Sequence, residues 1–267
     1  MSGENESEKR QNLEEVRRFF AELLDASSSQ GLVGVASFEI VYKELLPVQQ
    51  ANLENLVSEK YSEMADSGSI LSIAVAYPAS VIGCINVSRD DRIDFGSWNK
   101  YADQYHRLNE LLNANAQAMA ARFEGVAIPA TIEGIAAQVK DVSHYYPLTV
   151  SHRVVAEHAG LGWRGKNGLL INEKYSCAIR FASIATSLPL PHGKRMVTKC
   201  GDCTACEDVC TFIKYRSQLK DYRENCRRYL VYLQTKGLKR DVCGKCIQAC
   251  LFNGIYKDEY ILTDSGY

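Results

Sequence analysis

The sequence predicts an α+β chain with two parts, an α/β part over residues 11–191 and a small cysteine-rich part over residues 192–267. Two observations lead to this division. In the first part, apolar residues at helical spacing alternate with short, branched apolar runs that are typical of strands. In the second, eight of the ten cysteines fall between Cys200 and Cys250. Such uneven cysteine placement indicates a domain boundary.

Composition sets the broad class. The 267 residues are 46% hydrophobic and 24% charged, with a formal net charge of -1, which is the profile of a soluble globular protein. Charge alone therefore points to no partner. The first ten residues, MSGENESEKR, have no apolar stretch of signal-peptide length and are expected to form a disordered tail. The longest apolar run, residues 70–77, is too short to cross a bilayer, so we expect a cytoplasmic protein with no membrane segment.

The α/β part begins with a helix over residues 13–24, because Val16, Phe19, Phe20 and Leu23 keep helical spacing. The apolar run at 70–77 stops at Pro78, which favours a buried strand. Between and after these elements, we expect a strand within 32–40, a helix over 46–65, a long helix over 99–123, a short strand near 126–132 and a helix start near 131–133.

The later helices and strands are predicted from helix-capping residues and from the glycines and prolines that end regular structure. Ser151 is a good N-cap and Gly160 a good exit for a helix over 150–158. Strands are expected over 169–172 and 179–186, and the prolines of LPLPHGK, at 188–194, predict a linker.

The cysteine-rich part starts with the spacing C-x2-C-x2-C-x3-C, formed by Cys200, Cys203, Cys206 and Cys210. This spacing is typical of bacterial ferredoxins, in which three thiolates hold one iron-sulfur cluster and the fourth reaches a second. The remaining cysteines are Cys226, Cys243, Cys246 and Cys250. Eight thiolates are enough for two 4Fe-4S clusters, so we predict a ferredoxin-like two-cluster domain.

The economical assignment gives one cluster to Cys200, Cys203, Cys206 and Cys250. It gives the other to Cys210, Cys226, Cys243 and Cys246. A pair of structural zinc sites is the alternative, since four cysteines also suit zinc. The proline that usually follows the fourth cysteine is replaced by Thr211, and Leu251 follows Cys250.

The cysteine-rich part is basic, with thirteen Lys and Arg against six Asp and Glu between His192 and Lys245. One interpretation is that this excess balances the negative charge of two thiolate-ligated clusters. The other is a docking face for an acidic electron donor or for RNA.

The segment AGLGWRGKNGLLI, residues 159–171, resembles the signature of epoxyqueuosine reductases. ILSIAVAYP at 70–78, YADQYHRL at 101–108 and ATSLPLP at 185–191 are similar to that family at matching places, as is the cysteine layout. The resemblance implies a nitroreductase-like α/β domain, related to that of reductive dehalogenases, that binds cobalamin beside the two clusters. It further implies a homodimer by analogy of fold and a low-potential electron donor of the ferredoxin or flavodoxin type.

Several residues have expected roles through this resemblance. His106 matches a Tyr-His pair of the family and is a candidate for the corrin pocket. Glycines let a backbone approach a large flat ligand, although ordinary turn chemistry explains them equally well. The residues assigned to cobalamin are His106, Gly160, Gly162, Trp163, Gly165, Lys166 and Asn167.

The sequence also departs from the family. Upstream of Trp163, where the family has a proton-donating Asp, this chain has His144-Tyr145-Tyr146-Pro147. Tyr146, Tyr145 and His144 are therefore the candidate proton donors. Cys177 stands where the family usually has glycine.

Two functions remain open. The first is a cobalamin-dependent reductase acting on a small-molecule epoxide, halide or similar group. The second is an electron carrier that serves a partner corrinoid protein. The longer reductases continue into a helical-repeat domain that helps hold tRNA, which this sequence lacks, so tRNA is the less favoured substrate.

Overall fold

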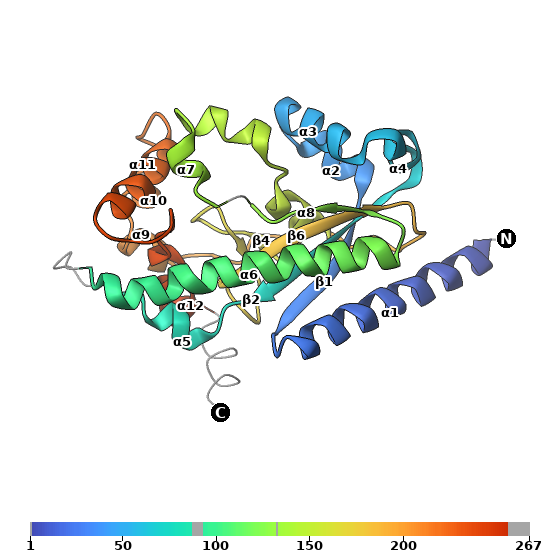
Figure 1. The fold of residues 1–267 in the computed structure, drawn as a ribbon, viewed down its shortest axis with the longest axis horizontal. Helices are drawn as coiled ribbons and strands as arrows, with labels where there is room; N and C mark the ends of the chain where they lie inside the picture. Colours follow the sequence, from blue (N-terminus) through green and yellow to red (C-terminus); the bar gives the residue numbers. More distant parts are fainter. Residues whose placement is uncertain (1, 87–92, 132, 256–267) are drawn as a thin grey trace.

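The computed structural model describes residues 2–86, 93–131 and 133–255, and a four-stranded sheet lies at its centre (Figure 1). Neighbouring strands are all antiparallel, in the order β1-β2-β6-β3. A separate hairpin pairs β4 with β5. The mixture of helices and strands confirms the predicted α+β class. The strands are β1 (Gly31–Ser37), β2 (Ser69–Ala76), β3 (Val126–Ile128), β4 (Trp163–Arg164), β5 (Leu170–Ile171) and β6 (Ile179–Thr186).

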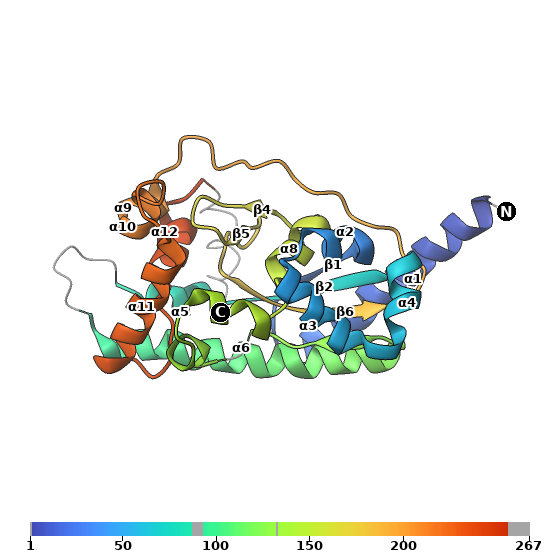
Figure 2. The same ribbon diagram turned by 90° about the horizontal axis from the view of Figure 1, so that it is seen from above.

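Helices cover both faces of the sheet. α1 (Ser2–Ala26) packs beside α6 (Phe95–Arg122) on one face, while α8 (His152–His158) and α2 (Phe38–Glu44) lie on the other (Figures 1 and 2). Because β2 has a strand on each side and helices above and below, all eight of its residues are buried. The other short helices here are α3 (Pro47–Val57), η1 (Ser58–Lys60), α4 (Tyr61–Ser67), α5 (Ala79–Gly83), α7 (Ile135–Gln138), η2 (Val142–His144) and η3 (Tyr146–Leu148).

Two expectations for the N-terminal region were wrong. Residues 1–10 do not form a disordered tail over their described part, since α1 already begins at Ser2 and Glu6 pairs with Lys9 across one helical turn at 3.8 Å. The strand expected within 32–40 ends at Ser37. The Ser37 hydroxyl accepts a hydrogen bond from Ile40 N at 3.4 Å and so caps α2.

The cysteine-rich part forms four helices at one end of the molecule (Figure 1). The linking segment, residues 187–204, contains no helix or strand and crosses the molecule to reach them (Figure 2). Leu233, Val242 and Leu251 nevertheless pack into the same apolar core as the sheet. The helices are α9 (Ala205–Asp208), α10 (Thr211–Lys214), α11 (Tyr222–Thr235) and α12 (Lys245–Asn253).

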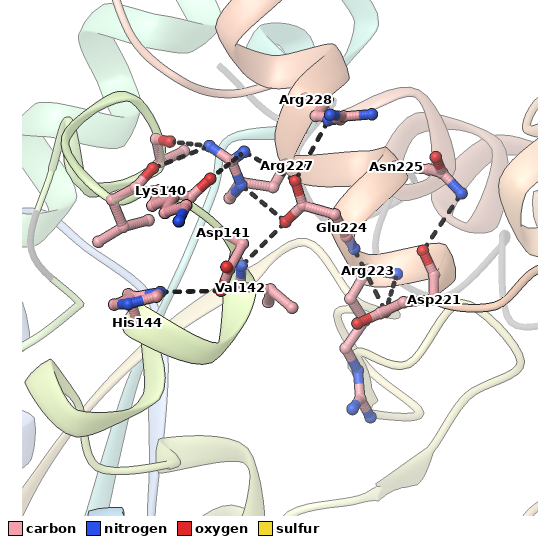
Figure 3. A network of polar contacts seen from close by, with 12 residues as sticks. Lys140, Asp141, Val142, His144, Asp221, Arg223, Glu224, Asn225, Arg227 and Arg228 are labelled. Atoms are coloured by element: carbon pink, nitrogen blue, oxygen red, sulfur yellow. Dashed lines mark hydrogen bonds and ion pairs between the residues drawn. The ribbon is translucent and has the colours of Figure 1, made fainter.

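Polar contacts join α11 to the loop before the two 3-10 turns (Figure 3). Arg227 donates to the carbonyl oxygens of Ala136 at 2.6 Å, Val139 at 3.3 Å and Lys140 at 3.1 Å. Glu224, one turn earlier, accepts from Val142 N at 2.8 Å. The position of this loop therefore depends on the cysteine-rich part.

Over the described residues, no helix has both the length and the apolar character needed to cross a membrane.

Candidate functional site

The first predicted set of four cysteines lines one cavity. Cys200, Cys203, Cys206 and Cys250 surround it together with Trp163. Cys203 comes from a turn, Cys206 from α9 and Cys250 from α12, so α9 packing on α12 brings them together. We call this space the first cysteine cavity.

The second predicted set lines another cavity, the second cysteine cavity. Cys210, Cys226, Cys243 and Cys246 surround a space of about 660 Å³ with the rings of Phe212 and Tyr229 among its walls. Cys226 lies on α11 and is exposed. The grouping of the eight cysteines in this structure is the grouping that the spacing predicts, while cluster binding itself stays a prediction.

The thiols are close enough to influence one another. Burial first, and then the neighbouring thiols of its own set, raise the pKa of Cys206 to about 12. Burial and Cys210 raise the pKa of Cys243 to about 11. Such crowded sulfur ligands suit a cation or cluster that neutralises their charge. In the part of the chain that the structure describes, however, no three His, Cys, Asp or Glu side chains are close enough to hold one metal ion.

The hairpin of β4 and β5 separates these cavities. Trp163 and Lys166 line the first cysteine cavity, and Asn167 lines the second. Lys166 Nζ donates to the carbonyl oxygen of Cys203 at 2.8 Å, which fixes the first cysteine turn. Gly162 and Gly165 pack directly on Ile171, and a Cβ on either would clash with it.

A third space, the central pocket, lies on the far side of this hairpin. Its volume is about 280 Å³, and it reaches from the sheet to α12. Its wall includes Gly168 and Leu169 of the hairpin, Tyr77 at the end of β2 and Cys177 before β6. Cys177 also packs in a buried group with Cys200, so the pocket adjoins the first cysteine cavity.

Two of the three predicted proton donors line the central pocket. Tyr145 and Tyr146 stand on its wall, whereas His144 does not. His144 is exposed and its Nδ1 lies 3.0 Å from Asp141 Oδ1 (Figure 3). Burial raises the pKa of Tyr145 to about 12, so its phenol keeps its proton at neutral pH.

The residues assigned to cobalamin do not line the central pocket. His106 Nδ1 lies 3.1 Å from Glu133 Oε2, and its side chain is half exposed. Gly160 follows α8 with φ +73°, where a Cβ would lie 3.0 Å from Lys194 O. Within the motif AGLGWRGKN, Trp163 and Lys166 line the first cysteine cavity and Asn167 the second, whereas the pocket is lined by the residues that follow, Gly168 and Leu169.

Arg180 is a pocket residue that sequence reasoning missed. It lies on β6 opposite Val75, and its Nε donates to Asn109 Oδ1 at 2.7 Å. Its guanidinium stacks on Tyr105, 4.0 Å from the ring centre. The sequence feature that could have indicated its role is a single charged residue between the apolar residues Ile179 and Phe181.

His152 is a second missed residue on the pocket wall. Its Nδ1 lies 2.8 Å from Ser183 Oγ and its Nε2 lies 2.8 Å from Pro129 O. Because a carbonyl oxygen only accepts, Nε2 donates and Nδ1 accepts from the serine hydroxyl. Burial lowers the pKa of His152 to about 4, so the ring is neutral at pH 7.

Comparison with known proteins shows which proteins this chain is similar to. No protein-family model matches the chain. It is 28% identical to the epoxyqueuosine reductase of Staphylococcus aureus (strain NCTC 8325 / PS 47) over 209 residues, which is 73% of this chain and 50% of that protein. It is also 28% identical to the epoxyqueuosine reductase of Lactococcus garvieae (strain Lg2) over 251 residues, 90% of this chain and 66% of that one. The chain is epoxyqueuosine reductase-like.

The chain spans about half the length of the Staphylococcus aureus relative, 50%, and 57% of the length of the epoxyqueuosine reductase of Bacillus cereus, to which it is 24% identical. Among solved structures, the epoxyqueuosine reductase from Streptococcus thermophilus matches 74% of this chain and 52% of its own, with 18% identity and a TM-score of 0.42.

Two kinds of cofactor are implied by the resemblance, and the residues suit them differently. The thiols around each cysteine cavity are the ligands that 4Fe-4S clusters take. The central pocket, at about 280 Å³, lies below the range of roughly 300–1,000 Å³ that holds drug-sized ligands. A whole corrinoid is larger still, so the pocket as it stands does not fit it.

Proposed function

We propose that this chain is an iron-sulfur oxidoreductase that reduces a small group bound in the central pocket. The observation that supports it is the arrangement of eight cysteines around two cavities, the first of which adjoins the pocket through Cys177. The names of the relatives supply the reaction type, since they are reductases.

Each cluster would be held by its own four thiolates and would carry one electron at a time from a low-potential donor. Reduction of an epoxide to an alkene needs two electrons and two protons and releases water, while removal of a halide needs two electrons and one proton and releases the halide ion. The chain's own part is to hold the substrate in the pocket and to supply a proton from Tyr145 or Tyr146. The resemblance adds cobalamin as the last electron carrier, and this remains a prediction.

The test is anaerobic reconstitution with iron and sulfide, followed by reduction with dithionite and incubation with a panel of epoxides and organohalides. We expect broad visible absorption, about eight iron atoms per chain, and alkene or dehalogenated product. Cys226→Ser should lower the iron content to about half, and Cys84→Ser, which alters a cysteine outside both cavities, should not. A colourless protein that binds only zinc would refute the proposal.

A carrier of electrons to a partner corrinoid protein is the second candidate. One observation favours it: no Asp or Glu lines the central pocket among the described residues. Reduced, cluster-loaded protein would then transfer electrons to a corrinoid protein and convert no small substrate. Cobalamin that co-elutes with the chain in gel filtration and supports turnover would rule out this alternative.

A further inference from the structure

Arg180 faces the central pocket with a positive charge that no carboxylate balances. Within the described ranges, no Asp or Glu forms an ion pair with it. A buried charge in a folded protein is normally paired. The chain follows this rule elsewhere, since fully buried Glu157 pairs with Arg153 at 3.3 Å, Arg164 at 2.9 Å and Arg195 at 2.9 Å.

The guanidinium of Arg180 is held in one orientation before any ligand arrives. Asn109 Oδ1 accepts from its Nε, and the face of Tyr105 supports its plane. Asn109 is itself fixed, because its Nδ2 donates to Glu133 at 2.9 Å. The charge of Glu133 is engaged elsewhere, with Arg240 Nη1 at 3.4 Å. A preorganised donor loses little conformational entropy on binding.

The other ionisable groups of the pocket leave this charge unmatched. Arg153 lines the pocket but is paired with Glu157. His152 is neutral at pH 7, because burial lowers its pKa to about 4. Arg180 is therefore the charged residue of the pocket wall that has no carboxylate partner among the described residues. Much of the remaining wall is apolar, from Val150, Leu169, Leu170, Ile179, Phe181 and Ile247.

We propose that Arg180 recognises a carboxylate group, so that the central pocket takes a small organic acid with an apolar or aromatic body. The planar guanidinium matches the two oxygens of a carboxylate and offers it a positive charge that has no carboxylate partner in the described residues. The identification of this acid as a substrate rests on the function proposed above, whereas its binding does not.

The experiment measures binding by calorimetry to the cluster-loaded protein, kept oxidised so that no turnover takes place. Benzoate is the probe, benzamide is its neutral counterpart of the same shape, and inorganic phosphate is a different anion. The variants are Arg180→Gln and Arg180→Lys, with Arg18→Gln, an exposed arginine on α1, as the control for loss of one charge.

We expect benzoate to bind at least about tenfold more tightly than benzamide or phosphate, since charge-assisted hydrogen bonds are the stronger ones. Arg180→Gln should abolish this preference and Arg18→Gln should leave it intact. If Arg180→Gln does not retain its clusters, Arg180→Lys is decisive: it keeps the charge but loses the planar fork, and we expect it to bind benzoate more weakly than wild type.

Equal binding of benzoate and benzamide would overturn the proposal, as would unchanged benzoate affinity in Arg180→Lys or tighter binding of phosphate. Turnover is assayed separately with dithionite. A protein that binds benzoate through Arg180 but reduces nothing would refute the proposed reductase function and support the carboxylate site.

Discussion

Tyr145 and Tyr146 stand side by side on the wall of the central pocket, but their hydroxyls have different surroundings. Tyr146 OH accepts a hydrogen bond from Arg223 Nη1 at 3.4 Å. The pKa of Tyr145 is raised to about 12 by burial and then by Tyr105. Its proton therefore stays in place until negative charge develops on a neighbouring group.

We expect Tyr145→Phe to slow substrate reduction by about 100-fold or more, as loss of a general acid does. Tyr146→Phe should slow it by less than about tenfold, because its hydroxyl already interacts with Arg223. Single-turnover product formation by pre-reduced, cluster-loaded protein measures both. Equal loss of rate in the two variants would contradict the assignment to Tyr145.

His152 makes stability depend on pH. Its pKa is about 4 in the folded chain and about 6.5 when unfolded. Between these values the unfolded state binds more protons, so stability falls as the pH drops from 6.5 to 4. The loss is about 3 kcal/mol.

The variant His152→Gln should lose less stability than wild type over this pH range, even if it is less stable at pH 7. Denaturant unfolding at several pH values between 7 and 4 measures the slope. His144→Gln, which changes an exposed histidine, serves as the control and should keep the wild-type slope. A wild-type slope in His152→Gln would show that other groups dominate.

Among individual residues, the sequence predicted those whose role depends on neighbours that are close along the chain. The short spacing of Cys200, Cys203 and Cys206 predicts that they share a cavity, whereas Cys250 joins them through the packing of α12 on α9. Arg180 was missed, because its role depends on Asn109 and Tyr105 of α6, which meet β6 only after folding. Lys166 was assigned to cobalamin, and its contact with Cys203 O depends on the tertiary packing of the hairpin.

Among the helices and strands, α11 has the clearest structural role. Arg227 on this helix satisfies three carbonyl oxygens of the loop that leads to Tyr145 and Tyr146. Arg228, the next residue, is exposed, and its Nε lies 3.4 Å from Glu224 Oε1 (Figure 3). Because the two arginines are neighbours on α11 but have different environments, a substitution of Arg228 is a matched control for a substitution of Arg227.

Arg227→Gln should destabilise the fold by about 2–3 kcal/mol, since hydrogen bonds from charged donors contribute roughly 1.5–3 kcal/mol each. Arg228→Gln should change stability by less than about 1 kcal/mol, as expected for an exposed ion pair. Urea unfolding of both variants gives the comparison. Hydrogen exchange should also rise at residues 139–142 in Arg227→Gln only.

Elements with strong local patterns were predicted well. The strand over 179–186 has the expected bounds, and the buried strand before Pro78 differs by one residue at each end. The break after Ser37 was not predicted, because Phe38 and Ile40 suit a strand as well as a helix. The capping hydrogen bond at Ser37 decides in favour of the helix.

Across the whole molecule, buried Glu157 connects three segments. It lies on α8 and pairs with Arg164 of the hairpin and Arg195 of the linking segment. The linking segment has a second ion pair, between Lys199 and Glu173, but both of these side chains are nearly half exposed. The buried and the exposed contact therefore differ in how much each should stabilise the fold.

Glu157→Gln should lower the free energy of unfolding by about 1.5–3 kcal/mol, because it removes the buried carboxylate that accepts from three partly exposed arginines. Glu173→Gln should cost no more than about 1 kcal/mol. Thermal and denaturant unfolding of the cluster-loaded protein distinguish the two. Similar losses in both variants would mean that Glu157 is not the main connection.

The hairpin of β4 and β5 has one further consequence. Leu169 of the hairpin lines both the central pocket and the second cysteine cavity, with Gly168 on the pocket side and Asn167 on the cavity side. Electrons tunnel readily across a layer of protein one side chain thick, whereas a substrate molecule cannot pass through it. With clusters in place, the hairpin would let electrons pass between the cysteine cavities and the pocket. It would keep substrate and solvent from passing the same way.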